Sequence, residues 1–310
     1  FLNAKFMRLS HKIHQSFVYA DRDIRLSNLG ICAITEHVGR TFRDMPALIK
    51  RNTPDVLTLR ECFEDFDMFS KLMFEFVYAF YAMNSHLTVY HGDLHLNNIT
   101  LMQLERRYDD QYVCYVCGGK NYVFQQNNIY STIIDFSRSV IADQQRIEDE
   151  FGERYAKLYF AEQSSRVLHN IAKYFPKTLE QYPQLRTMIT TDLPLIFKVM
   201  TSIDTYTVCS NIAYMIRSDV DFKHITMPPE ALQLLDQLAQ SSFDMTIKNL
   251  TDAATGVIKS PADIEFPNAV LLANYFEPYA VETEKLVSSD VILMDMYSPK
   301  PLKHDIDDYE

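Results

Sequence analysis

The sequence predicts a mixed α+β protein in which helices predominate. Its 310 residues include only 7 glycines, so few positions favour tight turns. Apolar residues recur at three- and four-residue spacings in residues 59–83, which is the period of an amphipathic helix. Short β-prone runs, such as residues 31–35 and 131–135, lie between the helical stretches. An apolar fraction of 47% is enough to bury a sizeable core.

The helical stretches differ in length, and prolines separate them. A strand pair formed by residues 16–19 and 31–35 is expected near the N-terminus. The helix of residues 59–83 follows, and residues 143–250 are mostly helical. The prolines at the expected breaks are Pro46, Pro54, Pro176, Pro183, Pro194, Pro228 and Pro229.

Short strands border two polar segments in the middle of the chain. The β-prone residues 87–90 precede a polar segment, HGDLHLNN, at 91–98, and residues 99–104 form a strand after it. A second strand, STIID at 131–135, is expected to be buried and ends in polar residues. The two polar segments therefore each follow a strand, where a folded protein often places functional loops.

An inserted hairpin is expected at residues 105–128, turning at Gly118-Gly119. Cys114-x-x-Cys117 within it resembles half of a zinc site. One such pair cannot complete a tetrahedral site without a second pair of ligands nearby. The preferred interpretation is a hairpin that places these cysteines at opposite strand positions, with metal binding as the alternative.

Charge and cysteine content exclude several kinds of partner. There are 41 acidic and 30 basic residues, a net charge of −11, and nucleic-acid binding needs a basic face, so no nucleic acid is expected. No stretch approaches the roughly 18 apolar residues of a membrane-spanning helix, so no membrane span is expected. The five cysteines are odd in number and irregularly spaced, which favours free thiols in a reducing compartment.

The strongest chemical pattern lies in the two polar segments. Asp93 is followed five residues later by Asn98, in a loop after a strand. Such an Asp can accept a proton from an attacking hydroxyl, and such an Asn can ligate Mg²⁺ on nucleotide phosphates. Asp135, at the end of the second strand, can bind the same ion. Singly, Asp93 could be a turn residue and Asn98 a cap, but the three together favour a nucleotide site.

In these residues the chain resembles the protein-kinase-like superfamily. HGDLHLNN is similar to its catalytic loop, and IIDFS at 133–137 is similar to its metal-binding D-F-G element, with Ser137 in place of glycine. The helix of residues 59–83 lies where the family's αE helix precedes the loop. The resemblance implies a mostly helical large lobe, an incomplete small β lobe, and ATP and Mg²⁺ as cofactors.

The resemblance also implies roles for residues outside the two segments. ICAITEHV at 31–38 is similar to the fifth strand and hinge, with Thr35 as gatekeeper and with Glu36 and Val38 offering backbone groups to adenine. Residues 202–208 are similar to the start of αF, whose Asp204 would brace the catalytic loop from below.

The two histidines of the loop have separate expected roles. His91 is expected to be a structural anchor of the loop rather than a general base, because Asp93 suits that role better. His95 either lies near the transferring phosphate or bonds the backbone, and both alternatives stay open.

The sequence departs from the family at several points. It has no G-x-G-x-x-G loop and no A-P-E, and Gly92 replaces the usual arginine. Lys5 is too close to the hinge to be the strand lysine, and no Glu precedes Glu36 to pair with one. Because the chain begins with Phe1, we expect a truncated small lobe. The expected organisation is a small-lobe remnant at 1–36, a large lobe at 37–258, and an extension with an acidic tail at 259–310.

The IIDFSRS element, the insertion before it and the helices after it resemble the divergent virion serine/threonine protein kinases of iridoviruses and poxviruses. This resemblance implies phosphorylation of virion or host proteins, contacts with other virion proteins, and location in the virion and the host cytoplasm. Two alternatives remain. One is an inactive pseudokinase with a structural role in a particle. The other is a small-molecule phosphotransferase, which an acidic acceptor pocket in the 143–200 helices would favour for a cationic metabolite.

Overall fold

The structure is a computed structural model. It describes residues 40–51, 54–86, 88–103, 112–127, 129–174, 183–219, 221–248, 268–282 and 291–294, with single positions 176, 180, 255, 257 and 259. Its contacts divide the chain into Phe1–His37 and Val38–Glu310, and every described residue belongs to the second unit. The predicted strand pair before residue 36 and the hinge residues Thr35, Glu36 and Val38 lie outside the described residues.

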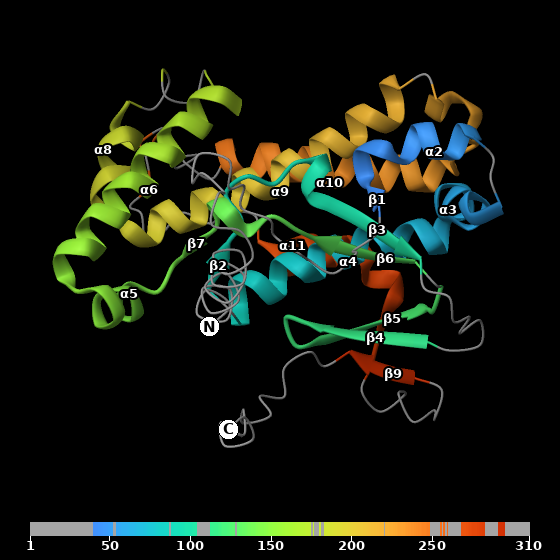
Figure 1. Cartoon of the computed structure of the whole chain (residues 1–310), viewed down its shortest axis with the longest axis horizontal. Helices are drawn as coiled ribbons and strands as arrows, with labels where there is room; N and C mark the ends of the chain where they lie inside the picture. The colour runs from blue at the N-terminus through green and yellow to red at the C-terminus, as the bar shows by residue number, and fades with distance from the viewer. Residues whose placement is uncertain are drawn as a thin grey trace, which may run out of the picture. The chain divides into compact units, whose positions relative to one another are not determined.

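The second unit is a mixed α+β fold in which helices predominate, as the sequence predicts (Figure 1). The α-helices are α2 (Met45–Arg51), α3 (Pro54–Glu64), α4 (Phe66–His86), α5 (Gln144–Phe151), α6 (Glu153–Tyr174), α8 (Gln184–Thr191), α9 (Leu193–Ser218), α10 (Pro229–Lys248) and α11 (Ala269–Ala273). The short 3-10 helices are η2 (Phe42–Asp44), η3 (Leu96–Asn98), η4 (Phe136–Arg138), η5 (Asp221–His224) and η7 (Asn274–Tyr279). Pro54, Pro194 and Pro229 lie in the first turn of their helices, where the missing N–H of proline costs no helical hydrogen bond.

The helix predicted at 59–83 is interrupted at Asp65, which separates α3 from α4. The Asp65 carboxylate accepts a hydrogen bond of 2.8 Å from the backbone N–H of Met68. This is the bond that an N-cap residue makes, and it satisfies a donor that a new helix leaves unpaired. The apolar period continues through the break, so it cannot reveal the interruption.

The strands form three small sheets (Figure 1). They are β1 (Arg40–Thr41), β2 (Val89–Tyr90), β3 (Ile99–Gln103), β4 (Tyr112–Cys117), β5 (Lys120–Gln125), β6 (Ile129–Ile133), β7 (Val140–Ile141), β8 (Ala280–Val281) and β9 (Val291–Met294). Strand β3 lies between β1 and β6, β2 pairs with β7, and the third sheet has the order β8-β5-β4-β9. The strand that the sequence predicts to be buried, β6, is buried at Ile129 and half-buried from Tyr130 onward.

The predicted hairpin is confirmed: β4 and β5 are antiparallel, and Gly118 and Gly119 form the turn with positive φ angles. Both cysteines of the C-x-x-C motif lie on β4, rather than on facing strands, and both are buried. The segments β8 and β9, from the region predicted as a C-terminal extension, pair with the two sides of the hairpin. The hairpin is therefore part of a sheet that distant segments complete.

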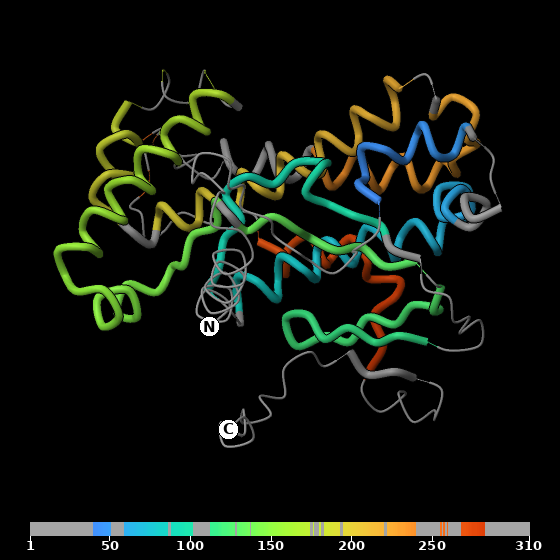
Figure 2. The backbone as a smooth tube through the Cα atoms, in the orientation of Figure 1, coloured from blue at the N-terminus to red at the C-terminus, as the bar shows by residue number. Residues whose placement is uncertain are grey.

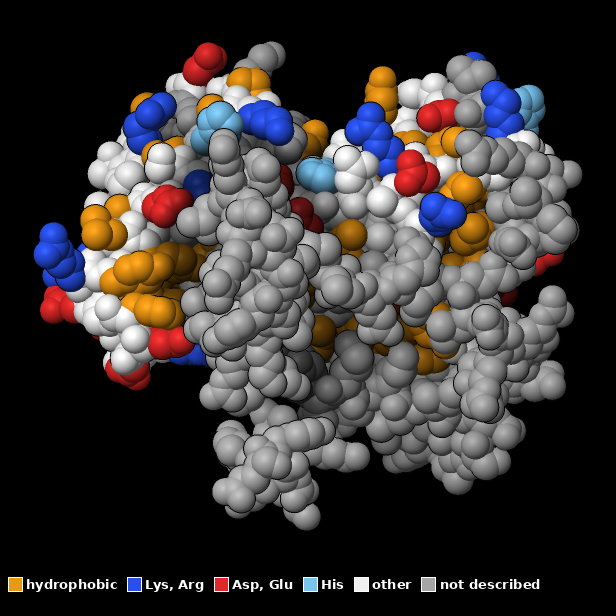
Figure 3. Space-filling model, viewed as in Figure 1, with side chains coloured by type: hydrophobic (Ala, Val, Ile, Leu, Met, Phe, Trp, Pro, Cys, Tyr) orange, Lys and Arg blue, Asp and Glu red, His pale blue; other side chains and the backbone are white. Residues whose placement is uncertain are grey.

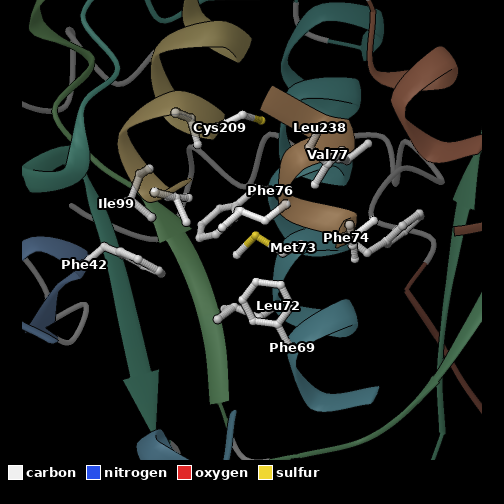
Figure 4. Packing of buried hydrophobic residues seen from close by; sticks show 14 of the residues in the cluster. Phe42, Phe69, Leu72, Met73, Phe74, Phe76, Val77, Ile99, Cys209 and Leu238 are labelled. Carbon is white, nitrogen blue, oxygen red and sulfur yellow. The ribbon is translucent and has the colours of Figure 1, made fainter. Parts of the chain in front are cut away.

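Helix α4 lies at the centre of the larger hydrophobic core. Figure 4 shows Phe69, Leu72, Met73 and Phe76 of α4 among side chains that come from other elements. On another side of the helix, the Phe74 ring packs against four aromatic rings, those of Tyr115, Tyr122, Phe124 and Phe276, at centroid distances of 4.6–5.7 Å. A helix that is apolar on most of its circumference is buried on most sides.

Helix α9 joins two hydrophobic clusters. Its N-terminal half, including Ile196 and Met200, packs with α5, α6 and α8 in the smaller cluster. Its C-terminal half, including Val208 and Ile212, packs in the larger cluster with α4 and α10. The tube in Figure 2 shows α9 extending between these two groups of helices. Residues near the middle of α9 therefore lie where the clusters meet.

The surface that Figure 3 shows is charged and polar over most of the described helices, and hydrophobic side chains gather on the side where α5 and α6 lie. The exposed hydrophobic residues of these two helices are Phe151, Tyr155 and Leu158. Within the part of the chain that the structure describes, no helix combines the length and the apolar character that crossing a membrane requires.

Two residues of α4 form a buried ion pair. The Lys71 ammonium is 2.6 Å from the Glu75 carboxylate, and the exposed fractions of the two side chains are 1% and 7%. Lys71 also donates to the Ile129 carbonyl at 2.9 Å. Glu75 accepts from the Tyr115 hydroxyl at 2.7 Å and from the Ser131 N–H at 2.9 Å. The pair thus links α4 to both β4 and β6.

We predict that Lys71→Met destabilises the protein by about 3–5 kcal/mol, because it leaves the Glu75 carboxylate buried without a counter-ion. Lys120→Met is the matched control, since Lys120 pairs with Glu277 at a similar distance of 2.8 Å but on the surface. Its cost should stay below about 1 kcal/mol. Urea denaturation of the two variants measures both values, and equal midpoints would contradict the assigned role of Lys71.

Candidate functional site

Two pairs of strands hold the two polar segments against each other. Strand β2 enters the loop of residues 91–98 and β3 leaves it, while β6 enters the segment of residues 134–139 and β7 leaves it. Because β3 pairs with β6 and β2 pairs with β7, the loops are held together at both ends. The N–H of Ile134 donates to the Asn98 carbonyl at 2.9 Å, which extends the β3–β6 pairing into the loops.

Gly92 makes the close approach of the two loops possible. Its φ is +76°, a left-handed conformation that costs a side-chain-bearing residue energy. A Cβ atom here would lie 2.9 Å from the Arg138 carbonyl oxygen and 3.1 Å from the Met200 methyl group. No residue larger than glycine fits without a shift of the backbone.

The Asp204 carboxylate, on α9, supports the loop from within the protein. Its Oδ2 accepts a hydrogen bond of 2.9 Å from the Gly92 N–H. Burial raises the pKa of Asp204 to about 7, and hydrogen bonds from the backbones of Gly92, Leu94 and His91 act in the opposite direction. A buried carboxylate needs such donors, so α9 and the loop constrain each other.

His91 is buried and links the two loops. Its Nε2 lies 2.9 Å from the Ile134 carbonyl oxygen, which can only accept, so Nε2 carries the proton. Its Nδ1 is then free to accept the N–H of Asp93, at 3.4 Å. Burial is the largest influence on the pKa of His91 and lowers it, and the lower pKa favours this neutral form. These contacts are those of a structural anchor.

Asn98 and Asp135 lie next to each other at the edge of the β3–β6 pair. The Asn98 side-chain N–H donates to the Asp93 carbonyl at 3.0 Å, so the amide oxygen is the atom left for a cation. Asp135 is exposed and has φ +61°, a strained conformation of the kind that clusters at functional sites. An amide oxygen and a carboxylate are hard ligands that suit Mg²⁺ when phosphate and water oxygens complete its octahedron.

No group of three or more His, Cys, Asp or Glu side chains suited to a metal occurs among the residues that the structure describes. The C-x-x-C motif also lacks further ligands within those residues. Burial raises the pKa of Cys117 to about 12 and also raises that of Cys114, which makes both thiols poor metal ligands.

Asp93 and His95 occupy the middle of the loop. One Asp93 carboxylate oxygen is 3.4 Å from the Arg138 guanidinium, and Asp93 is partly exposed. His95 caps η3 with its carbonyl, which accepts the Asn98 N–H at 2.8 Å. Its Nδ1 is buried and has no hydrogen-bond partner within the described part of the chain. An unpaired buried nitrogen is uncommon and is a feature that a bound polar group would satisfy.

A pocket of about 380 Å³ opens beside Asp93. Its base is formed by the loop and by α9, and its wall by η4 and α6. Its basic and histidine residues are Arg138, Arg166, His169 and Lys173. Neither Asn98 nor Asp135 lines it, so the candidate Mg²⁺ ligands lie outside this pocket.

The basic wall of this pocket lies outside the motifs that predict the site from the sequence. Arg166, His169 and Lys173 are spaced by three and four residues, which places them on one face of a helix. That spacing was a usable signal. Arg138 lies in the IIDFSRS element, but only the pairing of β2 with β7 brings it to α6, where the Arg166 guanidinium donates to its carbonyl.

Comparison with known proteins finds viral relatives. The chain is 26% identical over 297 residues to the uncharacterized protein C717R of African swine fever virus from a Kenyan pig isolate. It is 25% identical over 293 residues to the same protein from a Malawian tick isolate. These alignments cover 86% and 85% of this chain, and the chain spans about two-fifths of the length of these relatives. No family model and no solved structure matches.

We predict that Gly92→Ala destabilises the protein more than Gly119→Ala. Both glycines have φ near +80°, so both variants carry the backbone strain of about 1–2 kcal/mol. A Cβ at position 92 would also clash with the Arg138 carbonyl oxygen, whereas nothing lies within 4 Å of a Cβ at position 119. The added clash should cost a further 1–3 kcal/mol, roughly. Urea denaturation measures the difference, and equal costs would exclude the tight contact between the loops.

We predict a pH dependence that comes from Asp204. Its pKa in the folded protein, about 7, lies above the unfolded value of 3.8, so the folded state holds the proton more tightly. The stability of the wild type relative to Asp204→Asn should therefore fall as the pH rises from about 4 to 7 and level off above that. Denaturation midpoints across this range test it, and a difference that rises with pH would show the opposite shift.

Proposed function

We propose that this chain carries the catalytic loop and metal-binding element of a Mg²⁺- and ATP-dependent phosphotransferase that acts on serine and threonine hydroxyls of proteins. The observation that carries the proposal is the double strand pairing, which brings Asp93, Asn98 and Asp135 from two separate segments to one place. The residue types match those that phosphoryl transfer needs: a carboxylate for the hydroxyl and hard oxygens for Mg²⁺.

In the proposed mechanism, Asp93 orients the acceptor hydroxyl and accepts its proton as the oxygen attacks. Asn98 and Asp135 would hold Mg²⁺, which with ATP supplies charge neutralisation on the transferred phosphate. Asp204 and His91 act through the backbone: they fix the loop so that Asp93 stays in position. Most of the rate enhancement would come from this positioning.

The charge of the pocket disfavours a cationic metabolite as the acceptor. An aminoglycoside-like or choline-like substrate would need an acidic acceptor pocket, whereas Arg138, Arg166 and Lys173 make this one basic. A small-molecule phosphotransferase of that kind is therefore disfavoured.

The second candidate is a catalytically inactive protein that uses this fold for binding. The ion pair between Arg138 and Asp93 favours it, because it engages the carboxylate that the mechanism needs free. Against it, Arg138 is 65% exposed, and exposed pairs are weak enough for a substrate to displace.

The viral relatives support a place for the activity in infected cells. We propose that the protein acts in the host cytoplasm and is packaged in the virion, where virion proteins would be its substrates and contacts. The described cysteines are all free thiols, as a reducing compartment allows.

Transfer of ³²P from [γ-³²P]ATP with Mg²⁺ tests the proposal, using the chain together with any sequence that precedes Phe1 in its gene. Asp93→Asn and Asp135→Asn should each lower transfer to a serine-containing protein at least about a hundredfold. Asp143→Asn is the matched control: Asp143 caps α5, where Asn caps equally well, so activity should be unchanged.

Labelling of the wild type that both active-site variants lose, and the control keeps, is the expected result. No labelling of protein by a folded wild type, or labelling that survives Asp93→Asn, would contradict the phosphotransferase and favour the binding protein.

A further inference from the structure

We propose that the basic pocket beside Asp93 recognises an anionic side chain of the acceptor protein, a phosphoserine or a run of carboxylates next to the hydroxyl that is modified. This inference rests on the proposed function and specifies its substrate class. It concerns the wall formed by Arg138, Arg166, His169 and Lys173, which the catalytic roles above leave unused.

The charge of the pocket is opposite to that of the protein. The chain has a net charge of −11, yet three permanent cations converge on a pocket of about 380 Å³. The two acids that line it are Asp93 and the buried Asp204, whose pKa burial raises to about 7. A concentration of cations against the overall charge is a local field that attracts an anion.

The wall is organised rather than a chance group of surface cations. The Arg166 guanidinium is held by the Gln163 side chain at 2.9 Å and by the Arg138 carbonyl. These two contacts orient its planar donors and leave other N–H groups of the same guanidinium for a ligand. A fixed guanidinium is suited to bind a phosphate or carboxylate with two parallel hydrogen bonds.

The position of the pocket assigns the anion to the acceptor rather than to the nucleotide. Asp93 lines the pocket, so a group bound there lies beside the proposed base. Asn98 and Asp135, which would face the nucleotide phosphates, do not line it. A volume of about 380 Å³ has room for an acidic side chain and some of its backbone, since drug-sized pockets begin at about 300 Å³.

Peptide binding tests the inference directly. The probes are fluorescent peptides with one acceptor serine, in which phosphoserine occupies successive neighbouring positions, and the same peptide without phosphate. Fluorescence anisotropy without nucleotide should show at least one phosphopeptide binding roughly tenfold or more tightly than the unmodified one, a difference that shrinks as salt is raised.

Lys173→Gln and the double variant Arg138→Gln/Lys173→Gln should remove this preference. Arg138 is largely exposed and Lys173 is exposed, so neither change threatens the fold. Lys157→Gln is the matched control, because Lys157 lies on the same helix, α6, and pairs with Glu153 away from the pocket. It should keep the wild-type preference in full.

Kinetics with the same peptides separate this inference from the proposed function. The expected result is a lower KM for the favoured phosphopeptide, with a kcat that is unchanged or higher, and loss of the KM advantage in Lys173→Gln. Transfer to all peptides with equal KM would overturn the anion pocket while the phosphotransferase stands. Binding of phosphopeptide that depends on Lys173, without any transfer, would support the pocket while the phosphotransferase fails.

Competition with a non-hydrolysable ATP analogue and Mg²⁺ tests whether the peptide and the nucleotide bind at different places. The phosphopeptide should stay bound when the analogue is added, because the candidate Mg²⁺ ligands lie outside the pocket. Mutually exclusive binding would assign the basic wall to the nucleotide phosphates and overturn the inference.

Discussion

The hydrogen bond between the buried Asp204 carboxylate and the Gly92 N–H is the interaction on which the candidate site depends. Asp204 lies near the middle of α9, where the two hydrophobic clusters meet, so its position is fixed by packing on both sides. A carboxylate so deeply buried is tolerated only with donors around it, and backbone N–H groups of the loop supply them. The loop cannot move away without leaving that carboxylate unsatisfied. The hydrophobic core thereby sets the position of the polar loop, both through Asp204 and through Leu94, which is buried in the larger cluster.

The hydrogen bond to Asp204 fixes the loop at Gly92, and the strand pairs fix both polar segments at their ends. With β2 paired to β7 and β3 paired to β6, each polar segment is held at its entry and its exit. Gly92 lets the segments approach so closely that a Cβ atom at this position would lie 2.9 Å from the Arg138 carbonyl oxygen. Asp135, one of the candidate cation ligands, keeps a strained positive φ of 61° just after the end of β6. Paired strands on both sides of a strained residue can hold side chains in position before a substrate binds.

Sequence patterns reveal what short-range rules determine, and fail where distant segments decide. The Gly118-Gly119 turn and the two polar segments are local features, and each is where the sequence predicts it, whereas the helix predicted at 59–83 is divided at Asp65. The ion pair of Lys71 and Glu75 has the i,i+4 spacing of an ordinary surface pair, and only the packing of β4 and β6 against α4 buries it. The pairing of β9 with β4 joins residues that are far apart in the sequence, such as Tyr112 and Val291, and the sequence offers no periodic signal for it. The sequence indicates one part of the basic wall, because Arg166, His169 and Lys173 have the spacing of one helix face. It does not indicate that Arg138 lies beside them.

The ion pair between Arg138 and Asp93 connects the acceptor pocket to the proposed base. Its two side chains are 65% and 32% exposed, so water and salt screen the attraction, and such pairs contribute about 0–1 kcal/mol. An anionic acceptor in the pocket would compete with Asp93 for the Arg138 guanidinium, and a doubly charged phosphate competes better than one carboxylate. Drawing Arg138 away would free Asp93 to accept the hydroxyl proton at the moment when the acceptor is in place. Arg138 would then have two roles. It would bind the anionic acceptor, and it would stay paired with Asp93 until such an acceptor binds.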